Sequence, residues 1–266
     1  MIKMIVTDLD GTLLNENSKV SNETKIYLKK LKNMGYIIVI ATGRIYASAL
    51  KATDGAEFAN YLITDTGACL YDMSNSKIIF KNVIEKKTIE KLLDYYNNNF
   101  QYIYICDKNN IYKYSDNIEN SSIVKTTKDK DFILKSVDDV SHISIAMKNN
   151  DEVIKLYHKL LEDISEVDFD IMQDSFSDRK WIEISAKNIS KYNAISSLAT
   201  LLHIDNSEII VFGDGLNDID MLEKCGQGVA MKNALIEVKR IANDITNDDN
   251  NHDGVINYLK ENLDVK

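Results

Sequence analysis

The sequence predicts an α/β fold, in which a parallel-sheet core is interrupted by an inserted α+β module. Near both ends of the chain, short apolar runs typical of strands buried on both faces alternate with helical patterns. In the middle, apolar and polar residues alternate, which indicates strands with one wet face. We therefore predict a core domain from residues 1–82 and 188–266, and an inserted domain over 83–187.

The composition is that of a soluble globular protein, with 266 residues, 44% hydrophobic and 27% charged. The net charge of −9 argues against a general nucleic-acid or anionic-membrane binder. No apolar stretch is long enough to span a bilayer, and the first predicted strand leaves no room for a signal peptide. The three cysteines are too widely spaced for a disulfide framework. We expect a cytoplasmic monomer or weak homodimer with no nucleic-acid or membrane partner.

The first elements form a strand–helix–strand unit. A strand over residues 4–6 precedes a helical pattern that stops at Gly35, and a second strand covers 36–41. Such a βαβ unit should have a right-handed crossover and parallel strands. A third apolar segment, 61–63, continues the sheet.

The middle of the chain has a different pattern. Helical spacing predicts helices over 88–100 and 151–164. Alternation predicts strands over 102–105, 111–114, 142–147, 167–172 and 181–184. Trp181 and the tyrosines between 95 and 114 are interpreted as module core or exposed strand faces rather than as a base-stacking platform.

The parallel pattern resumes in the last third of the chain. We predict helices over 190–203 and 235–242, and strands over 209–212, 228–231 and 244–246.

Polar residues follow three of the predicted parallel strands. Asp8, Asp10 and Gly11 follow the first strand, Thr42-Gly43-Arg44 the second, and Gly213-Asp214-Gly215-Leu216-Asn217-Asp218 the strand over 209–212. The carboxyl ends of parallel neighbours share one edge of a sheet, where ligands collect. Gly11 permits a turn that lets the two acids converge, whereas in a plain strand they would point to opposite faces.

A nucleophilic carboxylate beside a second carboxyl suits covalent phosphoryl transfer, and their mutual repulsion implies a bridging Mg²⁺. The alternatives are an acidic β-turn for Asp8-Leu9-Asp10-Gly11, a plain turn for Thr42-Gly43 and a helix N-cap for the 213–218 loop. The order and strand-end placement of the three motifs together favour the phosphoryl-transfer site.

This combination resembles the haloacid dehalogenase (HAD) superfamily, and in particular its Cof-type sugar-phosphatase branch. The resemblance rests on three stretches, Asp8-Leu9-Asp10-Gly11-Thr12-Leu13-Leu14, Ala41-Thr42-Gly43-Arg44 and Gly213 to Leu222, and extends to 229–234 and 246–255. It implies a Rossmann-like core, a C2-type α/β cap at the position of the inserted module, and a Mg²⁺-dependent phosphatase acting on a small phosphorylated metabolite such as a sugar phosphate.

The resemblance also implies roles for individual residues. Asp8 would be the nucleophile that forms an aspartyl-phosphate, and Asp10 the general acid and base. Thr42 would hold a phosphoryl oxygen through its hydroxyl and backbone amide, and Lys191 would neutralise the nucleophile and the phosphoryl group. These four residues, Asp8, Asp10, Thr42 and Lys191, form the predicted catalytic set.

Two further sets follow from the same resemblance. The predicted substrate-binding residues are Thr42, Gly43, Arg44, Lys191, Asn217 and Asn233. The predicted Mg²⁺ ligands are Asp8, Asp10 through its carbonyl, Asp214 and, in support, Asp218. Asp178 and Arg179, just before a module strand, are weaker candidates for specificity.

The chain departs from the family pattern at three positions. Tyr192 stands where the family commonly has glycine after Ser-Lys, Thr66 where it often has asparagine, and Lys232 where it favours glycine. These departures concern the substrate more than catalysis. A phosphomutase with the same aspartyl chemistry, and a phospho-ligand-binding regulator without turnover, remain the alternative functions.

Overall fold

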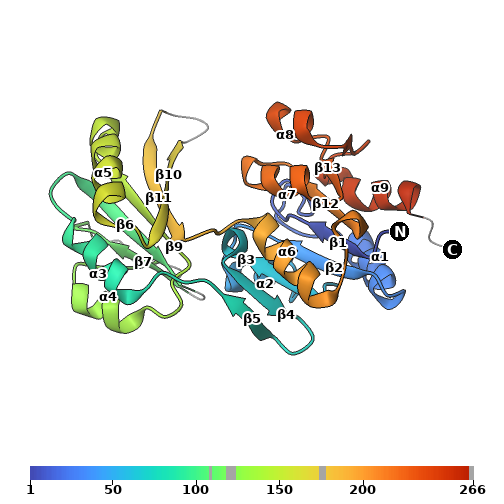
Figure 1. Cartoon of the computed structure of the whole chain (residues 1–266), viewed down its shortest axis with the longest axis horizontal. Helices are drawn as coiled ribbons and strands as arrows, with labels where there is room; N and C mark the ends of the chain where they lie inside the picture. Colours follow the sequence, from blue (N-terminus) through green and yellow to red (C-terminus); the bar gives the residue numbers. More distant parts are fainter. Residues whose placement is uncertain (108–109, 118–123, 174–177, 264–266) are drawn as a thin grey trace. The chain divides into compact units, whose positions relative to one another are not determined.

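The computed structural model describes residues 1–107, 110–117, 124–173 and 178–263. This part of the chain divides into two compact units, each with its own hydrophobic core (Figure 1). Unit 1 comprises Met1–Phe80 and Ile189–Lys266, and unit 2 comprises Lys81–Asn188.

Unit 1 is built on an eight-stranded sheet with the order β14-β13-β12-β1-β2-β3-β4-β5. Its strands are β1 (Met4–Thr7), β2 (Ile37–Ala41), β3 (Tyr61–Thr64), β4 (Cys69–Asp72), β5 (Lys77–Lys81), β12 (Ile209–Gly213), β13 (Gln227–Ala230) and β14 (Asp244–Ile245). The strands from β14 to β3 run parallel, as the sequence predicts.

The centre of this sheet is buried on both faces. All residues of β1 are buried, and Thr7 lies level with Phe212 of β12 and with Ile40 of β2. The run of valine and isoleucine fits a strand covered on both faces, since branched side chains pack well on a pleated surface. The three neighbouring strands therefore end side by side.

Beyond β3 the sheet changes direction. β4 pairs antiparallel with β3 after a short 3₁₀ turn, Asp65–Gly67, and β5 pairs with β4 at the sheet edge. These two strands were not predicted from the sequence. Exposed and half-buried residues alternate along β5, as expected for an edge strand with one solvent-exposed face.

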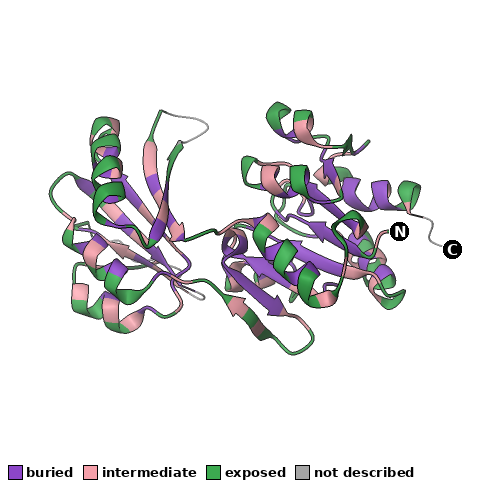
Figure 2. Cartoon of the chain, in the orientation of Figure 1, coloured by how far each residue is buried: buried purple, intermediate pink, exposed green. Residues whose placement is uncertain are grey.

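Helices pack on this sheet and expose their outer faces (Figure 2). They are α1 (Asn22–Asn33), α2 (Tyr46–Ala52), α6 (Lys191–Leu202), α7 (Ile219–Lys224), α8 (Ile236–Ile241) and α9 (Gly254–Asn262). α1 lies beside α9, and α7 lies beside both α6 and α8. Within the described ranges, no helix combines the length and apolar character needed to cross a membrane.

Unit 2 contains a six-stranded sheet with the order β10-β11-β9-β6-β7-β8. Its strands are β6 (Phe100–Cys106), β7 (Ile111–Tyr114), β8 (Val124–Thr127), β9 (His142–Met147), β10 (Val167–Gln173) and β11 (Lys180–Ala186). The pairs from β10 to β7 are antiparallel, as predicted, whereas β8 runs parallel to β7.

One face of this sheet is the core of unit 2. Ile103, Ile145 and Ile182 lie level on three neighbouring strands and are fully buried. They share a hydrophobic cluster with buried side chains of α3 (Lys86–Asp94), α4 (Lys130–Ser136) and α5 (Asn150–Asp163). Because side chains alternate along a strand, the residues between these isoleucines point to the opposite face.

The helix predicted over 88–100 is shorter than the pattern suggested. α3 ends at Asp94, and β6 begins at Phe100. The Asn97 side chain accepts a hydrogen bond from the Asn99 N–H and donates one to the Tyr95 carbonyl. Asparagine satisfies nearby backbone groups in non-helical conformations, which explains why apolar spacing alone misplaced this end.

Candidate active site

Three parallel strand ends bring the predicted motifs together in unit 1. Asp8 directly follows β1, Thr42 follows β2, and Asp214 follows β12. These strands are neighbours, so their carboxyl ends lie on one edge of the sheet. The Asp8 N–H donates to the Phe212 carbonyl, which extends the sheet pairing to the first residue of the site.

A buried lysine links two of these motifs. Lys191 Nζ lies 2.7 Å from Asp8 Oδ1 and 2.6 Å from Asp218 Oδ1. Lys191 and Asp218 are fully buried, and Asp8 is buried as well. A lysine is rarely buried unless it is paired, and here a single ammonium group holds two carboxylates.

The position of Lys191 depends on how closely its helix approaches the sheet. Ser190 caps α6, accepting a hydrogen bond from the Asn193 N–H. Gly67 has φ +110°, and a Cβ at this position would lie 2.2 Å from the Ser190 carbonyl oxygen. A glycine is therefore required where the 3₁₀ turn meets the first turn of α6.

The loop after β12 is held by Asp218. Its Oδ2 accepts hydrogen bonds from the backbone N–H groups of Asp214 and Gly215, each 3.0 Å long. Asp214 Oδ1 accepts a hydrogen bond of 2.8 Å from the Thr12 hydroxyl. Gly11 has φ +76°, and a Cβ there would lie 2.2 Å from Asp214 Oδ2. The loop that carries Asp8 therefore packs directly against Asp214.

Thr12 has a role that its sequence position did not reveal. Thr12 lies within the Asp8 motif, and its hydroxyl orients Asp214 across 202 residues of sequence. Only the pairing of β1 with β12 places the two residues in contact.

Burial shifts the pKa values of this cluster. Burial, reinforced by Asp218, raises the pKa of Asp8 to about 7 although Lys191 opposes the shift. Burial also raises the pKa of Asp214 to about 6. Burial by itself would lower the pKa of Lys191, but its two carboxylate partners outweigh that effect and leave it above the ordinary value. The site thus holds more carboxylates than cations.

The acidic cluster fits a divalent metal ion. Asp8, Asp214 and Asp218 each offer a carboxylate oxygen, and these atoms lie within 4.8 Å of one another. Mg²⁺ prefers oxygen ligands and often takes only one or two carboxylates from the protein. Both oxygens of Asp218 already accept hydrogen bonds, so Asp8 and Asp214 are better placed to bind a metal directly, with Asp218 in support.

Asp10 takes a different position from Asp8. Its carboxylate forms a two-pronged pair with Arg44, in which Nε donates to Oδ2 at 2.7 Å and Nη2 to Oδ1 at 2.5 Å. The Asp10 side chain is 56% exposed. Among the described residues, the acidic cluster that could hold a metal does not include the Asp10 carboxylate, and the contact predicted for Asp10 is through its backbone carbonyl.

The end of β2 provides a small hydroxyl-rich turn. The Thr42 N–H donates to the Ile63 carbonyl, so the predicted contact between this amide and a phosphoryl oxygen does not fit the structure. The Thr42 hydroxyl accepts a hydrogen bond from the Arg44 N–H. A Cβ on Gly43 would lie 3.5 Å from Thr66 Oγ1 and 3.7 Å from Asn217 Nδ2, which places these two side chains beside the turn.

Asn233 connects two segments beside the site, and its contact with substrate stays a prediction. Its Nδ2 donates to the Gly11 carbonyl at 2.7 Å, and its Oδ1 accepts from the Asn250 N–H at 3.1 Å. The side chain therefore connects the Asp8 loop to the chain before α9. This geometry assigns Asn233 to positioning the loop.

This chain is similar in sequence to a family of hydrolases and to curated phosphatases, and similar in structure to solved proteins. A family model described as haloacid dehalogenase-like hydrolase matches residues 5–259. A Bacillus subtilis relative named 5-amino-6-(5-phospho-D-ribitylamino)uracil phosphatase YcsE is 27% identical, with 97% of this chain and 95% of the relative covered. Phosphatase YwpJ of the same organism is also 27% identical, with coverage of 97% and 99%. The solved structure of TM0651 from Thermotoga maritima is similar with a TM-score of 0.80 and 25% identity, covering 98% of this chain and 97% of that one.

Proposed function

Because this chain belongs to the haloacid dehalogenase-like hydrolases, we propose that it is a Mg²⁺-dependent phosphatase acting through a covalent intermediate on Asp8. The observation that carries the proposal is the buried ammonium of Lys191, fixed between Asp8 and Asp218 at the strand end. This arrangement orients the Asp8 carboxylate and supplies positive charge where a phosphoryl group would gain negative charge.

The proposed reaction has two steps. An Asp8 oxygen attacks the phosphorus, the bond to the leaving oxygen breaks, and that oxygen takes a proton from Asp10. Water then attacks the aspartyl-phosphate, giving its proton to Asp10 and releasing inorganic phosphate and a free Asp8 carboxylate. Mg²⁺ held by Asp8 and Asp214 would add positive charge at the phosphoryl oxygens.

Arg44 fixes the position of the Asp10 carboxylate. The two-pronged pair engages the Asp10 carboxylate, which is not part of the acidic cluster of Asp8, Asp214 and Asp218. Because both Asp10 oxygens accept hydrogen bonds from Arg44, one of these bonds must break before Asp10 can exchange a proton with the leaving oxygen.

The proposed substrates are small phosphomonoesters such as sugar phosphates. Asn217 and Thr66 flank the Gly43 turn and offer an amide and a hydroxyl to the phosphoryl oxygens or to nearby hydroxyl groups. The name of the Bacillus subtilis relative joins a phosphorylated sugar-alcohol chain to a uracil ring, which extends the proposed range to such conjugates.

The test is phosphate release from a panel of phosphomonoesters, with and without Mg²⁺. Asp8→Asn should abolish release while leaving the fold intact. Asp220→Asn is the matched control, since Asp220 lies in the first turn of α7, outside the acidic cluster. A trapped phosphoenzyme that hydroxylamine cleaves would identify the acyl-phosphate.

Each outcome separates the alternatives. Release that persists in Asp8→Asn would reject the covalent route. Transfer of the phosphoryl group to a second hydroxyl, with a requirement for a bisphosphate, would indicate a phosphomutase. Tight binding of phosphorylated ligands without turnover would indicate a regulator.

A further inference from the structure

The second face of the unit 2 sheet carries aromatic and polar side chains. Across β11, β9 and β6, one row contains Glu183, Ser144 and Tyr104. The next row contains Trp181, Ala146 and Tyr102. These positions alternate with the buried isoleucines of the core, so they share the opposite face.

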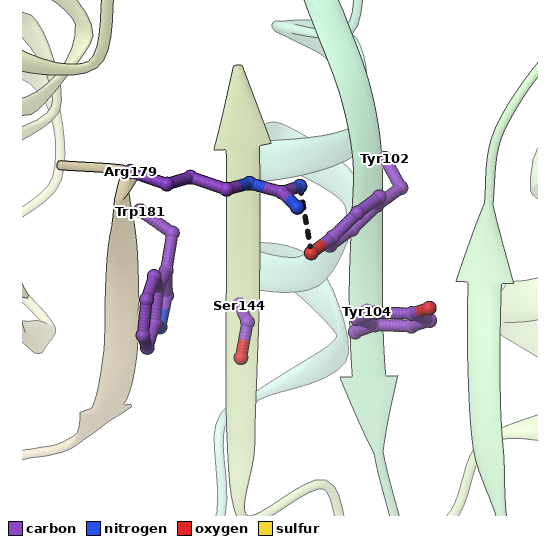
Figure 3. Close-up of a pocket in the computed structure, with 5 residues that line it drawn as sticks. All are labelled: Tyr102, Tyr104, Ser144, Arg179 and Trp181. Atoms are coloured by element: carbon purple, nitrogen blue, oxygen red, sulfur yellow. Dashed lines mark hydrogen bonds between the residues drawn. The ribbon is translucent and has the colours of Figure 1, made fainter. Parts of the chain in front are cut away.

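A pocket lies on this face (Figure 3). Its volume is about 310 Å³, and it is lined by Tyr102, Tyr104, Ser144, Arg179 and Trp181. Trp181 stands on β11, the tyrosines stand on β6, and the small Ser144 lies between them on β9 (Figure 3). Two aromatic walls thus flank a floor made of a short side chain.

The aromatic walls are held in place by specific contacts. The rings of Tyr102 and Tyr104 lie 4.3 Å apart between centroids and are tilted by 43°. Trp181 Nε1 donates to Glu183 Oε2 at 3.2 Å, and the Ser144 hydroxyl donates to the same oxygen at 2.7 Å. Because the Ser144 hydroxyl proton is donated to Glu183, the Ser144 oxygen can only accept a hydrogen bond from a ligand in the pocket.

Positive charge lies at the rim. The Arg179 guanidinium donates to the Tyr102 hydroxyl at 3.2 Å and lies 5.6 Å from the centre of that ring. Lys113 Nζ lies 5.6 Å from the centre of the same ring. The cations favour a ligand with acceptor oxygens, and the rings favour one with a flat face.

We propose that this pocket binds a planar heteroaromatic ring carrying carbonyl and N–H groups, of the pyrimidine type. The ring would lie between the side chains of Trp181 and Tyr104. Its N–H group would donate a hydrogen bond to the Ser144 oxygen, and its carbonyl oxygen would accept one from Arg179. Its size fits, because small-ligand pockets begin near 300 Å³. The proposal concerns unit 2 alone and does not depend on the proposed phosphatase activity.

Three half-buried aromatic side chains around one small residue are the basis of this inference. From the sequence, Trp181 and the tyrosines were interpreted as module core or exposed strand faces rather than as a base-stacking platform. The structure places Tyr102, Tyr104 and Trp181 outside the hydrophobic core of unit 2 and around one pocket.

Trp181 makes the test direct, because it is the sole tryptophan of the chain. Its fluorescence in the full-length protein is followed during titration with uridine, excited at wavelengths where pyrimidines do not absorb. Dihydrouridine is the matched ligand, with the same polar groups on a puckered ring, and ribose is the ligand without a ring base. We expect saturable quenching by uridine, at least tenfold weaker binding of dihydrouridine, and no saturable response to ribose.

Three variants separate stacking from general effects. Tyr104→Leu should weaken uridine binding about tenfold, which corresponds to about 1.4 kcal/mol. Tyr104→Phe keeps the ring and should bind within about twofold of the wild type. Tyr157→Leu changes a tyrosine of α5, outside the pocket lining, and should leave binding unchanged.

The proposal is wrong if uridine causes no saturable quenching, or if dihydrouridine or ribose binds equally well. It is equally wrong if Tyr104→Leu binds like the wild type. Because the probes carry no phosphate, a failure here says nothing against phosphate release, and a failure of phosphate release says nothing against this pocket.

Discussion

Replacing Lys191 by methionine should destabilise unit 1 severely. The side chain is fully buried, and its ammonium lies 2.7 Å from Asp8 and 2.6 Å from Asp218. At an effective dielectric constant of about 20, each contact contributes about 6 kcal/mol of Coulomb attraction. The dehydration of three charged groups and the repulsion between the carboxylates offset much of this, so breaking such a buried pair costs about 3–5 kcal/mol.

The cost should depend on pH with a definite sign. Without the ammonium, Asp8 is a buried carboxylate with no cation to oppose the effect of burial, so its folded-state pKa rises further. A raised folded-state pKa gives stability that is fully present below the unfolded value, about 3.9 for aspartate, and is lost as pH rises through the folded value. The gap between Lys191→Met and the wild type should therefore be smaller near pH 5 than near pH 7.

The assay is urea unfolding, followed both by far-UV circular dichroism and by Trp181 fluorescence. Trp181 lies in unit 2, so the loss should appear in the dichroism transition attributable to unit 1. Lys187→Met is the control, because Lys187 is half exposed and contacts Asp168 at 2.9 Å. Its loss should cost at most about 1 kcal/mol. Equal effects of the two substitutions, or a cost that does not change with pH, would refute the reasoning.

Three further predictions concern other parts of the chain. Thr66 has φ +56°, which is unfavourable for a β-branched residue, so Thr66→Asn should raise the free energy of unfolding by about 1 kcal/mol, whereas Thr66→Val should bring no gain. Gly11→Ala would place a Cβ 2.2 Å from Asp214 Oδ2 and should lower phosphate release about a hundredfold, while Gly35→Ala, with no atom within 4 Å of its Cβ, should lose only stability. Comparable activities of these two variants would contradict that account. Burial raises the pKa of Glu183, so the free energy of unfolding of unit 2 should fall as pH rises through that raised pKa. Glu183→Gln should remove this dependence on pH in unfolding followed by Trp181 fluorescence. An unchanged dependence on pH would exclude Glu183 as its source.

The sequence predicted the architecture of the core and the sheet edge at which the candidate site lies. Runs such as Met4–Thr7 are apolar throughout, because central parallel strands are covered on both faces. Polar residues directly after β1, β2 and β12 could be assigned to one sheet edge, because parallel neighbours end together. Both features can be recognised from consecutive residues alone, without knowledge of contacts between distant parts of the chain.

Other features were decided by tertiary structure alone. The family resemblance singled out Lys191 in the sequence, but its burial between Asp8 and Asp218 depends on the close approach of α6 to Gly67. The pocket of unit 2 likewise joins residues from three strands that are distant in sequence.

The roles of single polar side chains were the least predictable. Asn233, which the sequence suggested as a substrate contact, also holds the Gly11 carbonyl, and the Thr42 amide is used within the sheet. A hydroxyl or amide can serve a ligand or the backbone with equal chemistry. Which partner the side chain binds depends on which group the fold places within about 3 Å of it. This distance cannot be inferred from the residue type or from the local sequence pattern.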